Sequence, residues 1–237
     1  IMKGLIWFRS DIRIDDNPAL LNASKTCDEL IGIYIFSKSQ WFLHNESVVK
    51  LDFLHKNLIQ LEQSLKKLNI PLLVIETKNY ESLPSALASF VKQNSVDHIF
   101  WNNEFGVNEC KRDLAVNNLL NDYGINSTCF DDQVIYKPGY LKTGQGKPFS
   151  VFTPFKRRWI ENFSLDFINL EKATKLSTIP QLKSDLSPLN FSKEHAVDMT
   201  LWPAGEASAL ERLSSFLDKK VNSYNQSRND PILDGTS

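Results

Sequence analysis

The chain has 237 residues, of which 42% are hydrophobic and 23% are charged. These are ordinary values for a globular protein, and they exclude a wholly disordered chain. Lysine and arginine number 27 and aspartate and glutamate 28, so the formal net charge of −1 excludes a chain that binds polyanions over its whole surface but leaves room for a local basic patch.

Cysteine usage and hydropathy favour a cytoplasmic location. The three cysteines form no CxxC pair, which favours a reducing, intracellular environment. No apolar run approaches the length of a membrane span. The charged residues Arg9 and Asp11 come too early for a secretory signal. We therefore expect a cytoplasmic monomer that does not interact with membranes.

The first 130 residues alternate between two periods. Short apolar runs predict buried strands at residues 3–8, 30–36, 72–76, 97–101 and 127–130. Helical patterns between them cover residues 17–25, 48–68, 81–93 and 107–123. This alternation predicts an α/β fold with a doubly wound, five-stranded parallel sheet. In such sheets, ligands bind beyond the carboxyl ends of the strands.

The pattern breaks after Asp131. Residues 132–198 are rich in proline and have little periodicity, apart from a short helix predicted near residues 153–163. A structureless segment of that length is unusual inside one compact domain. Another helix begins near Gly205. We therefore expect an α/β domain over residues 1–131, an interdomain linker over 132–198 and the start of a helical domain over 199–237.

Charged residues of alternating sign follow the first strand, from Arg9 to Asp16. They could close the turn between strand and helix with salt bridges, or they could form a ligand loop at the crevice of the sheet. Because structural ion pairs also gather charges of both signs, the spacing favours the salt-bridge interpretation.

Three polar residues follow other strands and are candidate ligand contacts. His44 could contact a flat ligand, although a lone loop histidine is more often a polar surface residue. Glu109 could simply complement the dipole of the helix that it opens, and Asn108 could cap that helix. Alternatively, the amide and the carboxylate face the crevice, where a carboxylate can accept paired N–H donors from a heterocycle such as a pterin. Chemistry alone leaves these two readings evenly balanced.

Residues 133–160 contain six lysines and arginines, interleaved with aromatic residues, and no acid. Cations with aromatics can bind a nucleic-acid backbone. The alternative is an interdomain strap with buried aromatics and solvated cations. The aromatics recur at steps of three and four, which favours this alternative. Nothing in the sequence assigns a metal site or a catalytic residue.

Five motifs together resemble the DNA photolyase and cryptochrome family over nearly the whole chain. They are WFRSDIRIDDNPAL at 7–20, KPFSVFTPF at 147–155, WPAGE at 202–206, YNQSRNDP at 224–231 and GTS at 235–237. The sequence is most similar to the N-terminal portion of a photolyase that uses a folate antenna and acts on cyclobutane pyrimidine dimers.

The resemblance implies a two-domain, light-driven repair enzyme. Reduced FAD in the helical domain would donate an electron to a pyrimidine dimer flipped out of UV-damaged DNA. The α/β domain would hold the antenna pigment. By their match to family positions, His44, Asn108 and Glu109 would contact methenyltetrahydrofolate, Tyr224, Thr236 and Ser237 would contact FAD, and Arg228 would contact DNA.

The sequence ends where the flavin pocket of the family begins. We therefore expect this chain to be the antenna-binding, N-terminal part of a deoxyribodipyrimidine photolyase and to be inactive in repair by itself. A cryptochrome-type blue-light receptor shares all these segments and is the nearest alternative. A stand-alone nucleotide-binding module is a further one, and it predicts an adenine nucleotide at the crevice. The antenna could also be a deazaflavin or another flavin.

Overall fold

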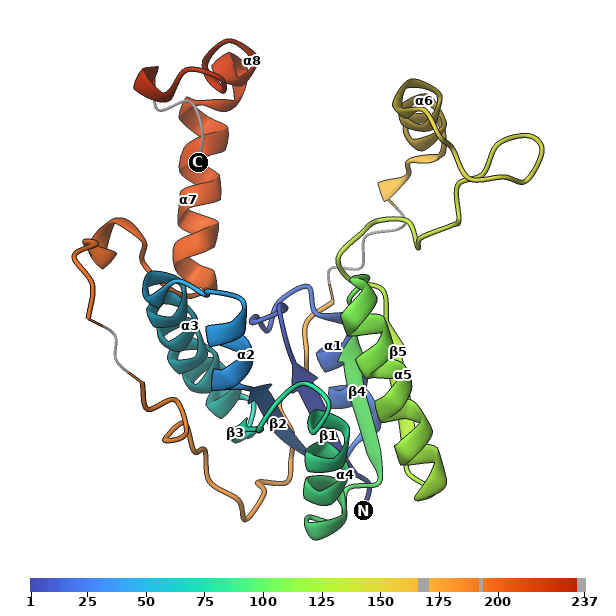
Figure 1. The fold of residues 1–237 in the computed structure, drawn as a ribbon, viewed down its shortest axis with the longest axis vertical. Coiled ribbons are helices and arrows are strands. Elements are labelled where there is room, and N and C mark those ends of the chain that lie inside the picture. The colour runs from blue at the N-terminus through green and yellow to red at the C-terminus, as the bar shows by residue number, and fades with distance from the viewer. Residues whose placement is uncertain (166–170, 192–193, 234–237) are drawn as a thin grey trace.

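A five-stranded parallel sheet organises the protein in the computed structural model, which describes residues 1–165, 171–191 and 194–233 (Figure 1). The strand order is β3-β2-β1-β4-β5, and every pair is parallel. The strands are β1 (Lys3–Phe8), β2 (Glu29–Phe36), β3 (Leu72–Glu76), β4 (His98–Asn102) and β5 (Asn126–Phe130). The predicted α/β architecture is confirmed.

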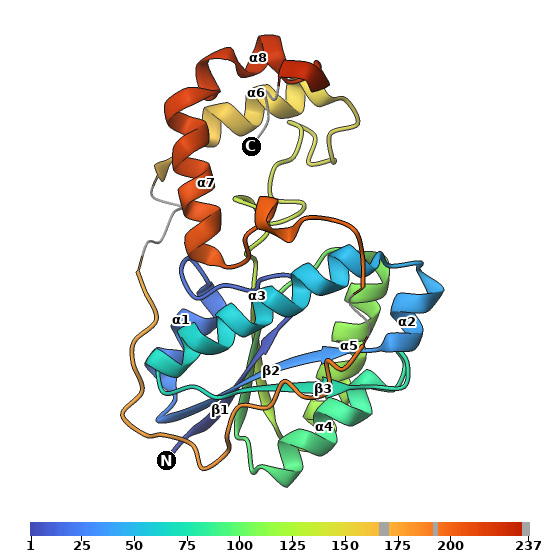
Figure 2. The ribbon, with the colours of Figure 1, turned by 90° about the vertical axis from the view of Figure 1, so that its left-hand side faces the viewer.

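Helices cover both faces of the sheet. The helices are α1 (Pro18–Thr26), α3 (Val48–Lys67), α4 (Leu83–Gln93) and α5 (Val107–Asp122). Side chains of α1 and α3 pack with Ile6 and Phe8 on one face, and those of α4 and α5 pack with Leu5 and Trp7 on the other. Figure 2 shows these helices around the sheet. Successive residues of a strand point to opposite faces, so β1 contributes to both cores.

Local signals set the helix boundaries. The Asn17 side chain accepts a hydrogen bond from the Leu20 N–H at 3.1 Å, and Pro18 is the first helical residue of α1. Asn69 and Gly124, just after α3 and α5, have φ values of 65° and 68°. These left-handed residues end the helices at the positions that the sequence predicts. A short helix, α2 (Lys38–Leu43), follows β2 and was not predicted.

A returning segment covers the β3 edge of the sheet. Val74 N–H donates to the Asp185 carbonyl and Asp185 N–H donates to the Leu72 carbonyl, both at 2.9 Å. Leu176 and Leu189 from the same segment join the core on the α1 and α3 face. We call residues 171–191 the edge strap. It follows the segment that carries the helix over Phe152–Asn162, and it precedes the last helices of the chain.

Two arms rise from the same side of the α/β unit (Figure 1). One carries α6 (Phe152–Asn162), and the other carries α7 (Glu206–Lys219) and α8 (Tyr224–Ser227). Short 3₁₀ turns lie at Met199–Leu201, Val221–Ser223 and Pro231–Leu233. Within the described residues, no helix has both the length and the apolar character needed to cross a bilayer. The expected domain boundaries at 131 and 198 stay a prediction.

Candidate functional site

A cavity of about 400 Å³ opens at the carboxyl ends of the strands. Residues at the ends of four strands line it. Arg9, Ser37 and Thr77 directly follow β1, β2 and β3, and Glu104 lies two residues beyond β4. The chain reverses its direction of winding between β1 and β4, and ligands of doubly wound sheets bind beside such a reversal. The predicted crevice therefore exists as a cavity of ligand size.

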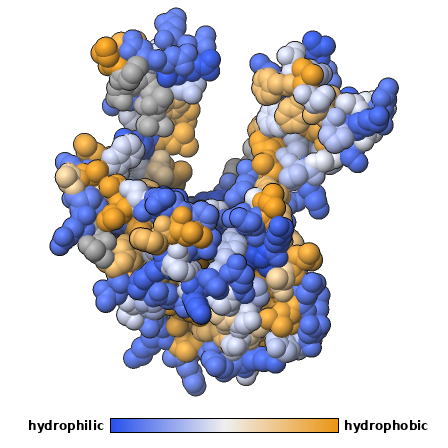
Figure 3. Space-filling model, in the orientation of Figure 1, coloured by the Kyte–Doolittle hydropathy of each residue, from blue (hydrophilic) through white to orange (hydrophobic). Residues whose placement is uncertain are grey.

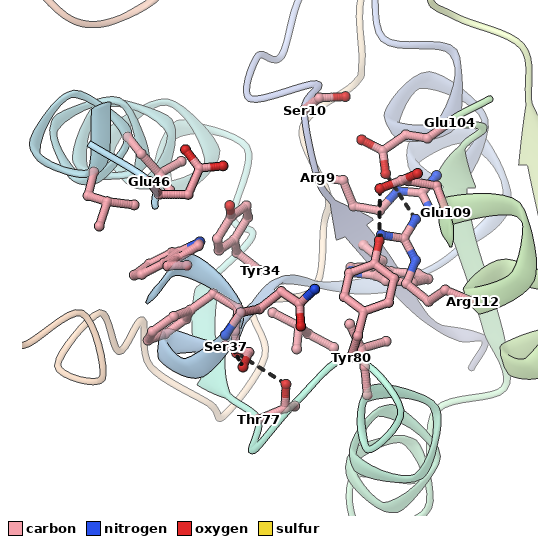
Figure 4. Close-up of a pocket in the computed structure, with 18 of the residues that line it drawn as sticks. Arg9, Ser10, Tyr34, Ser37, Glu46, Thr77, Tyr80, Glu104, Glu109 and Arg112 are labelled. Atoms are coloured by element: carbon pink, nitrogen blue, oxygen red, sulfur yellow. Dashed lines mark hydrogen bonds and ion pairs between the residues drawn. The ribbon is translucent and has the colours of Figure 1, made fainter. Parts of the chain in front are cut away.

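Arg9, Arg112 and Glu104 line one wall of this cavity, and Asp113 pairs with both arginines (Figure 4). Arg9 Nη1 donates to both Asp113 carboxylate oxygens, at 2.9 and 2.8 Å. Arg112 donates through Nε to Asp113 at 2.8 Å and through Nη2 to Glu104 at 2.9 Å. Both guanidinium groups lie over the Trp7 ring, 4.6 and 4.9 Å from its centroid. These four charges compensate one another, but the acids that pair with Arg9 lie after β4 and on α5, outside the Arg9–Asp16 loop, and Arg9 itself lines the cavity.

The electrostatics of this wall keep Glu104 ionised. Burial alone would raise the pKa of Glu104. The charge of Arg9 and the hydrogen bonds from Arg112 and Ser10 outweigh burial and hold that pKa below its usual range. The wall therefore presents fixed, paired charges at neutral pH.

Tyr80 links Arg112 to the candidate carboxylate Glu109. The Tyr80 hydroxyl donates to Glu109 Oε1 at 3.1 Å and accepts from Arg112 Nη1 at 3.0 Å. Burial, opposed by the Arg112 charge and assisted by Glu109, raises the pKa of Tyr80 to about 12, so the phenol stays neutral. Among the residues that the structure describes, no cation lies within ion-pair distance of Glu109. Glu109 therefore keeps acceptor capacity for a ligand.

Aromatic side chains form the opposite wall. Trp41, from α2, stacks on Phe36 with ring centroids 4.6 Å apart and planes 19° apart. Tyr34 also lines the cavity, and burial raises the pKa of its phenol far above the usual value. Phe191 of the edge strap meets the Trp41 ring edge-on at 5.5 Å. A flat ring system would thus have an aromatic wall on one side and an acceptor on the other.

The structure brings one of the three predicted antenna contacts to this cavity. Glu109 lines it. His44 is exposed at the end of α2, with its Nε2 atom 2.7 Å from Gln40 Nε2. Asn108 is exposed in the first turn of α5. Neither side chain is among those lining the cavity, and their roles stay predictions.

The remaining predicted residues lie on the α7–α8 arm or beyond the described chain. Tyr224 meets Phe216 edge-on, with centroids 5.8 Å apart. The Arg228 guanidinium lies 5.9 Å from the Tyr224 ring centroid. Thr236 and Ser237 are outside the described residues. The Tyr224 and Arg228 contacts are consistent with a local cluster but do not test ligand binding.

Several cavity residues were not selected from the sequence as ligand contacts, among them Tyr34, Tyr80 and Arg112. Tyr80 follows the third predicted strand, so its place in the chain is a usable signal for the crevice. Arg112 is one helical turn after Asn108 and Glu109, and that spacing would place it near them. Its pairing with Glu104 depends on tertiary packing.

Comparison with known proteins gives consistent matches. A family model described as DNA photolyase matches residues 4–177. The deoxyribodipyrimidine photo-lyase of Vibrio cholerae serotype O1 is 32% identical and that of Escherichia coli strain K12 is also 32% identical; each match covers 98% of this chain. The matches cover 50% and 49% of those proteins, so the chain spans about half the length of the curated relatives it matches.

Solved structures share the fold. A bacterial class III photolyase from Agrobacterium tumefaciens superposes with a TM-score of 0.82 and 27% identity, over 99% of this chain and 48% of that one. A Synechocystis cryptochrome superposes with a TM-score of 0.72 over 97% of this chain and 49% of that one. At 19% identity, the second likeness concerns the fold alone.

Proposed function

The chain belongs to the DNA photolyase family, and from this premise we propose that it is the antenna-binding part of an enzyme that repairs cyclobutane pyrimidine dimers in light. The observation that carries the proposal is the 400 Å³ cavity with Glu109 at its polar wall, in a chain whose residues 4–177 match the family model. In this proposal, residues 1–131 form the antenna domain, 132–198 the linker and 199–237 the start of the flavin domain.

The chemistry of the cavity fits a flat heterocycle with N–H donors. The Glu109 carboxyl group accepts one hydrogen bond, from the Tyr80 hydroxyl, so it can accept further hydrogen bonds from a pterin edge. The stacked Trp41 and Phe36 rings offer an apolar surface for the ring system. Methenyltetrahydrofolate meets both requirements, and we propose it as the antenna. Light absorption is the chemistry that this pigment supplies.

The chain's own residues would bind, orient and enclose the pigment. The paired charges of Arg9, Arg112 and Glu104 fix the polar wall without movement, since each is held by at least one charged partner. Tyr80 orients the Glu109 carboxylate. In the proposal, His44 and Asn108 contact parts of the pigment that extend beyond the cavity onto the surface, where both side chains lie.

For the whole protein, we propose FAD as the electron donor and UV-damaged DNA as the substrate. Tyr224, Thr236 and Ser237 would contact FAD, and Arg228 would contact the DNA. The support for these roles is the match of their motifs to the family, together with the relatives named deoxyribodipyrimidine photo-lyase, about half of whose length this chain matches.

Titration of the purified chain with methenyltetrahydrofolate tests the antenna role. We expect a saturable shift of the pigment's near-ultraviolet absorption band and a rise in its fluorescence anisotropy. Glu109→Gln should weaken binding about tenfold, because a charge-assisted hydrogen bond contributes about 1.5 kcal/mol or more. A deazaflavin and FAD serve as competing ligands. If none of the three binds saturably, the antenna proposal is wrong.

A further inference from the structure

The aromatic wall of the cavity depends on a short helix. Trp41 lies on α2, and the two residues that follow it, Phe42 and Leu43, are 87% and 71% exposed. Figure 3 shows hydrophobic residues on the surface where α2 and α3 lie. None of the six residues of α2 is buried. Because so short a helix has little stability of its own, the contacts of the Trp41 ring must fix its position.

Two rings from distant parts of the chain hold the Trp41 indole. Phe36, the last residue of β2, stacks on it with ring centroids 4.6 Å apart and planes 19° apart. Phe191, the last residue of the edge strap, meets it with centroids 5.5 Å apart and planes 77° apart. One contact is nearly parallel and the other nearly perpendicular, so together they restrain the indole in two directions. Such aromatic pairs contribute energy beyond the burial of apolar area.

The core and α3 hold Phe191 in turn. Leu189, just before it in the edge strap, is 3% exposed and belongs to the core on the α1 and α3 face. Phe191 packs against the same core, and its ring lies 6.3 Å from the His55 ring of α3. The edge strap thus brings Phe191 from the core to the Trp41 side of α3.

A buried carboxylate of α3 anchors the chain on the other side of Phe191. His195 Nε2 lies 3.3 Å from Asp52 Oδ2, and the two side chains are 11% and 7% exposed. Lys56 Nζ donates to the same oxygen at 2.6 Å. Burial alone would raise the pKa of Asp52, but hydrogen bonds from Lys56 and His195 outweigh burial and hold that pKa below its usual range. The ionised carboxylate can therefore hold His195 against α3 at neutral pH.

We propose that Phe191 is a positioning residue for the pigment cavity, because it holds the Trp41 indole in the place where it forms the aromatic wall. Phe191 is not among the side chains that line the cavity, so it acts through Trp41. The identity of the ligand rests on the proposed function. In this proposal, His195 and Asp52 keep the chain beside Phe191 in place, and the cavity has its full shape only with the edge strap seated.

Pigment affinity tests the proposal. Phe191→Leu keeps an apolar side chain but removes the ring that meets Trp41. In titrations with methenyltetrahydrofolate, we expect it to raise the dissociation constant about two- to tenfold, the effect of losing one aromatic contact. It should also shift the absorption maximum of the bound pigment. His195→Ala should change both quantities in the same direction, and it is the second variant should Phe191→Leu not fold.

A matched control disturbs the edge strap away from Trp41. Leu176 is 4% exposed in the same strap, and its N–H donates to the Leu68 carbonyl at 3.1 Å. Leu176→Ala should lower the melting temperature because it leaves a cavity in the core. Below that temperature, the pigment affinity and the absorption maximum should equal those of the unmodified chain. A purely structural role of the strap would not separate the two variants.

Near-ultraviolet circular dichroism gives a readout that needs no pigment. The Trp41 band is the difference between the spectrum of a chain and that of the same chain with Trp41→Phe. We expect Phe191→Leu to reduce this band and Leu176→Ala to leave it unchanged. If the unmodified chain binds no pigment, the proposed function fails, and the Trp41 band alone then decides whether Phe191 positions Trp41.

Three results would overturn the proposal. One is an unchanged Trp41 band in Phe191→Leu. Another is an equal loss of pigment affinity in Phe191→Leu and Leu176→Ala. The third is a reduced Trp41 band with unchanged pigment affinity, since the wall would then form without the contact between Phe191 and Trp41.

Discussion

The carboxylate of Glu109 lies against the α-carbon of Gly106, in the space that a β-carbon at position 106 would occupy. The backbone of Gly106 is extended, with φ −65° and ψ 149°, a conformation open to any residue. Glycine is therefore needed here for space. Its missing side chain lets the first-turn carboxylate fold back over the start of α5 and face the cavity.

Gly106→Ala should displace Glu109 and weaken binding of the proposed folate about tenfold, since it removes one charge-assisted contact. The measurement is the same absorption titration that tests the antenna role. Gly144→Ala is the control, because nothing lies within 4 Å of a β-carbon at that loop position. Equal affinities for the two variants would show that Glu109 does not position the ligand.

Asp113→Asn should cost about 3 kcal/mol of unfolding free energy. The change leaves Arg9 and Arg112, with side chains only 5% and 7% exposed, with Glu104 as the one acid of the described residues at ion-pair distance. Urea denaturation measures the loss. Glu161→Gln, which breaks a half-exposed pair with Arg158, should change stability by less than about 0.5 kcal/mol. A similar small effect for both would mean that the buried network contributes little.

Stability should fall in acid partly through Glu104. Its pKa is lower in the folded state than in the unfolded state, so the unfolded chain binds more protons between the two values. The contribution is complete above the ordinary value of about 4.3 and is lost as the pH falls through the lower, folded value. The unfolding free energy of Glu104→Gln, measured from about pH 6 to 3, should therefore decline less steeply than that of the unmodified chain. Parallel curves would assign acid sensitivity to other groups.

Glu206 should control how α7 is fixed to the α/β unit. Its two carboxylate oxygens accept from the N–H groups of Ile14 and Asp15, at 3.1 and 2.9 Å. Gly205, with φ 100°, donates its N–H to Asn57 Oδ1 at 2.9 Å, which holds the same junction. Glu206→Ala should accelerate amide hydrogen exchange at residues 14 and 15, whereas Glu211→Ala, an exposed acid on the same helix, should not. Unchanged exchange in both variants would contradict an anchoring role.

Hydrophobic periodicity predicted the sheet and its large helices because each element has a repeating pattern of apolar residues within its own sequence. Six leucines recur at steps of three and four between residues 51 and 68, and three of them, Leu58, Leu61 and Leu65, are buried. The α2 helix has no such pattern, because it has six residues and none of them is buried. A single helical turn and a half cannot show a period, so sequence patterns alone could not find it.

The site was predictable as a location more than as a set of side chains. The rule that ligands bind at the carboxyl ends of parallel strands placed the crevice correctly, and Glu109 was found there. The contact between Arg9 and Asp113 joins residues 104 positions apart, and the Tyr80 bridge to Arg112 spans 32. Such pairings depend on how β1, α4 and α5 pack against one another. Local sequence patterns do not predict that packing. Of the aromatics in 149–159, Phe149 and Trp159 are half-buried and Phe152 and Phe155 are exposed, and the strap interpretation stays a prediction.

The edge strap changes how this protein should behave when damaged. A border strand with free amide and carbonyl groups is a template for self-association through added strands. Asp185 occupies those groups at Leu72 and Val74, so β3 does not present a bare border there. Proteolytic cleavage of the strap would leave the strands and helices of residues 1–131 intact. It would expose the backbone N–H and C=O groups of β3 for pairing with another chain. Aggregation, rather than unfolding, would then be the first sign of such cleavage.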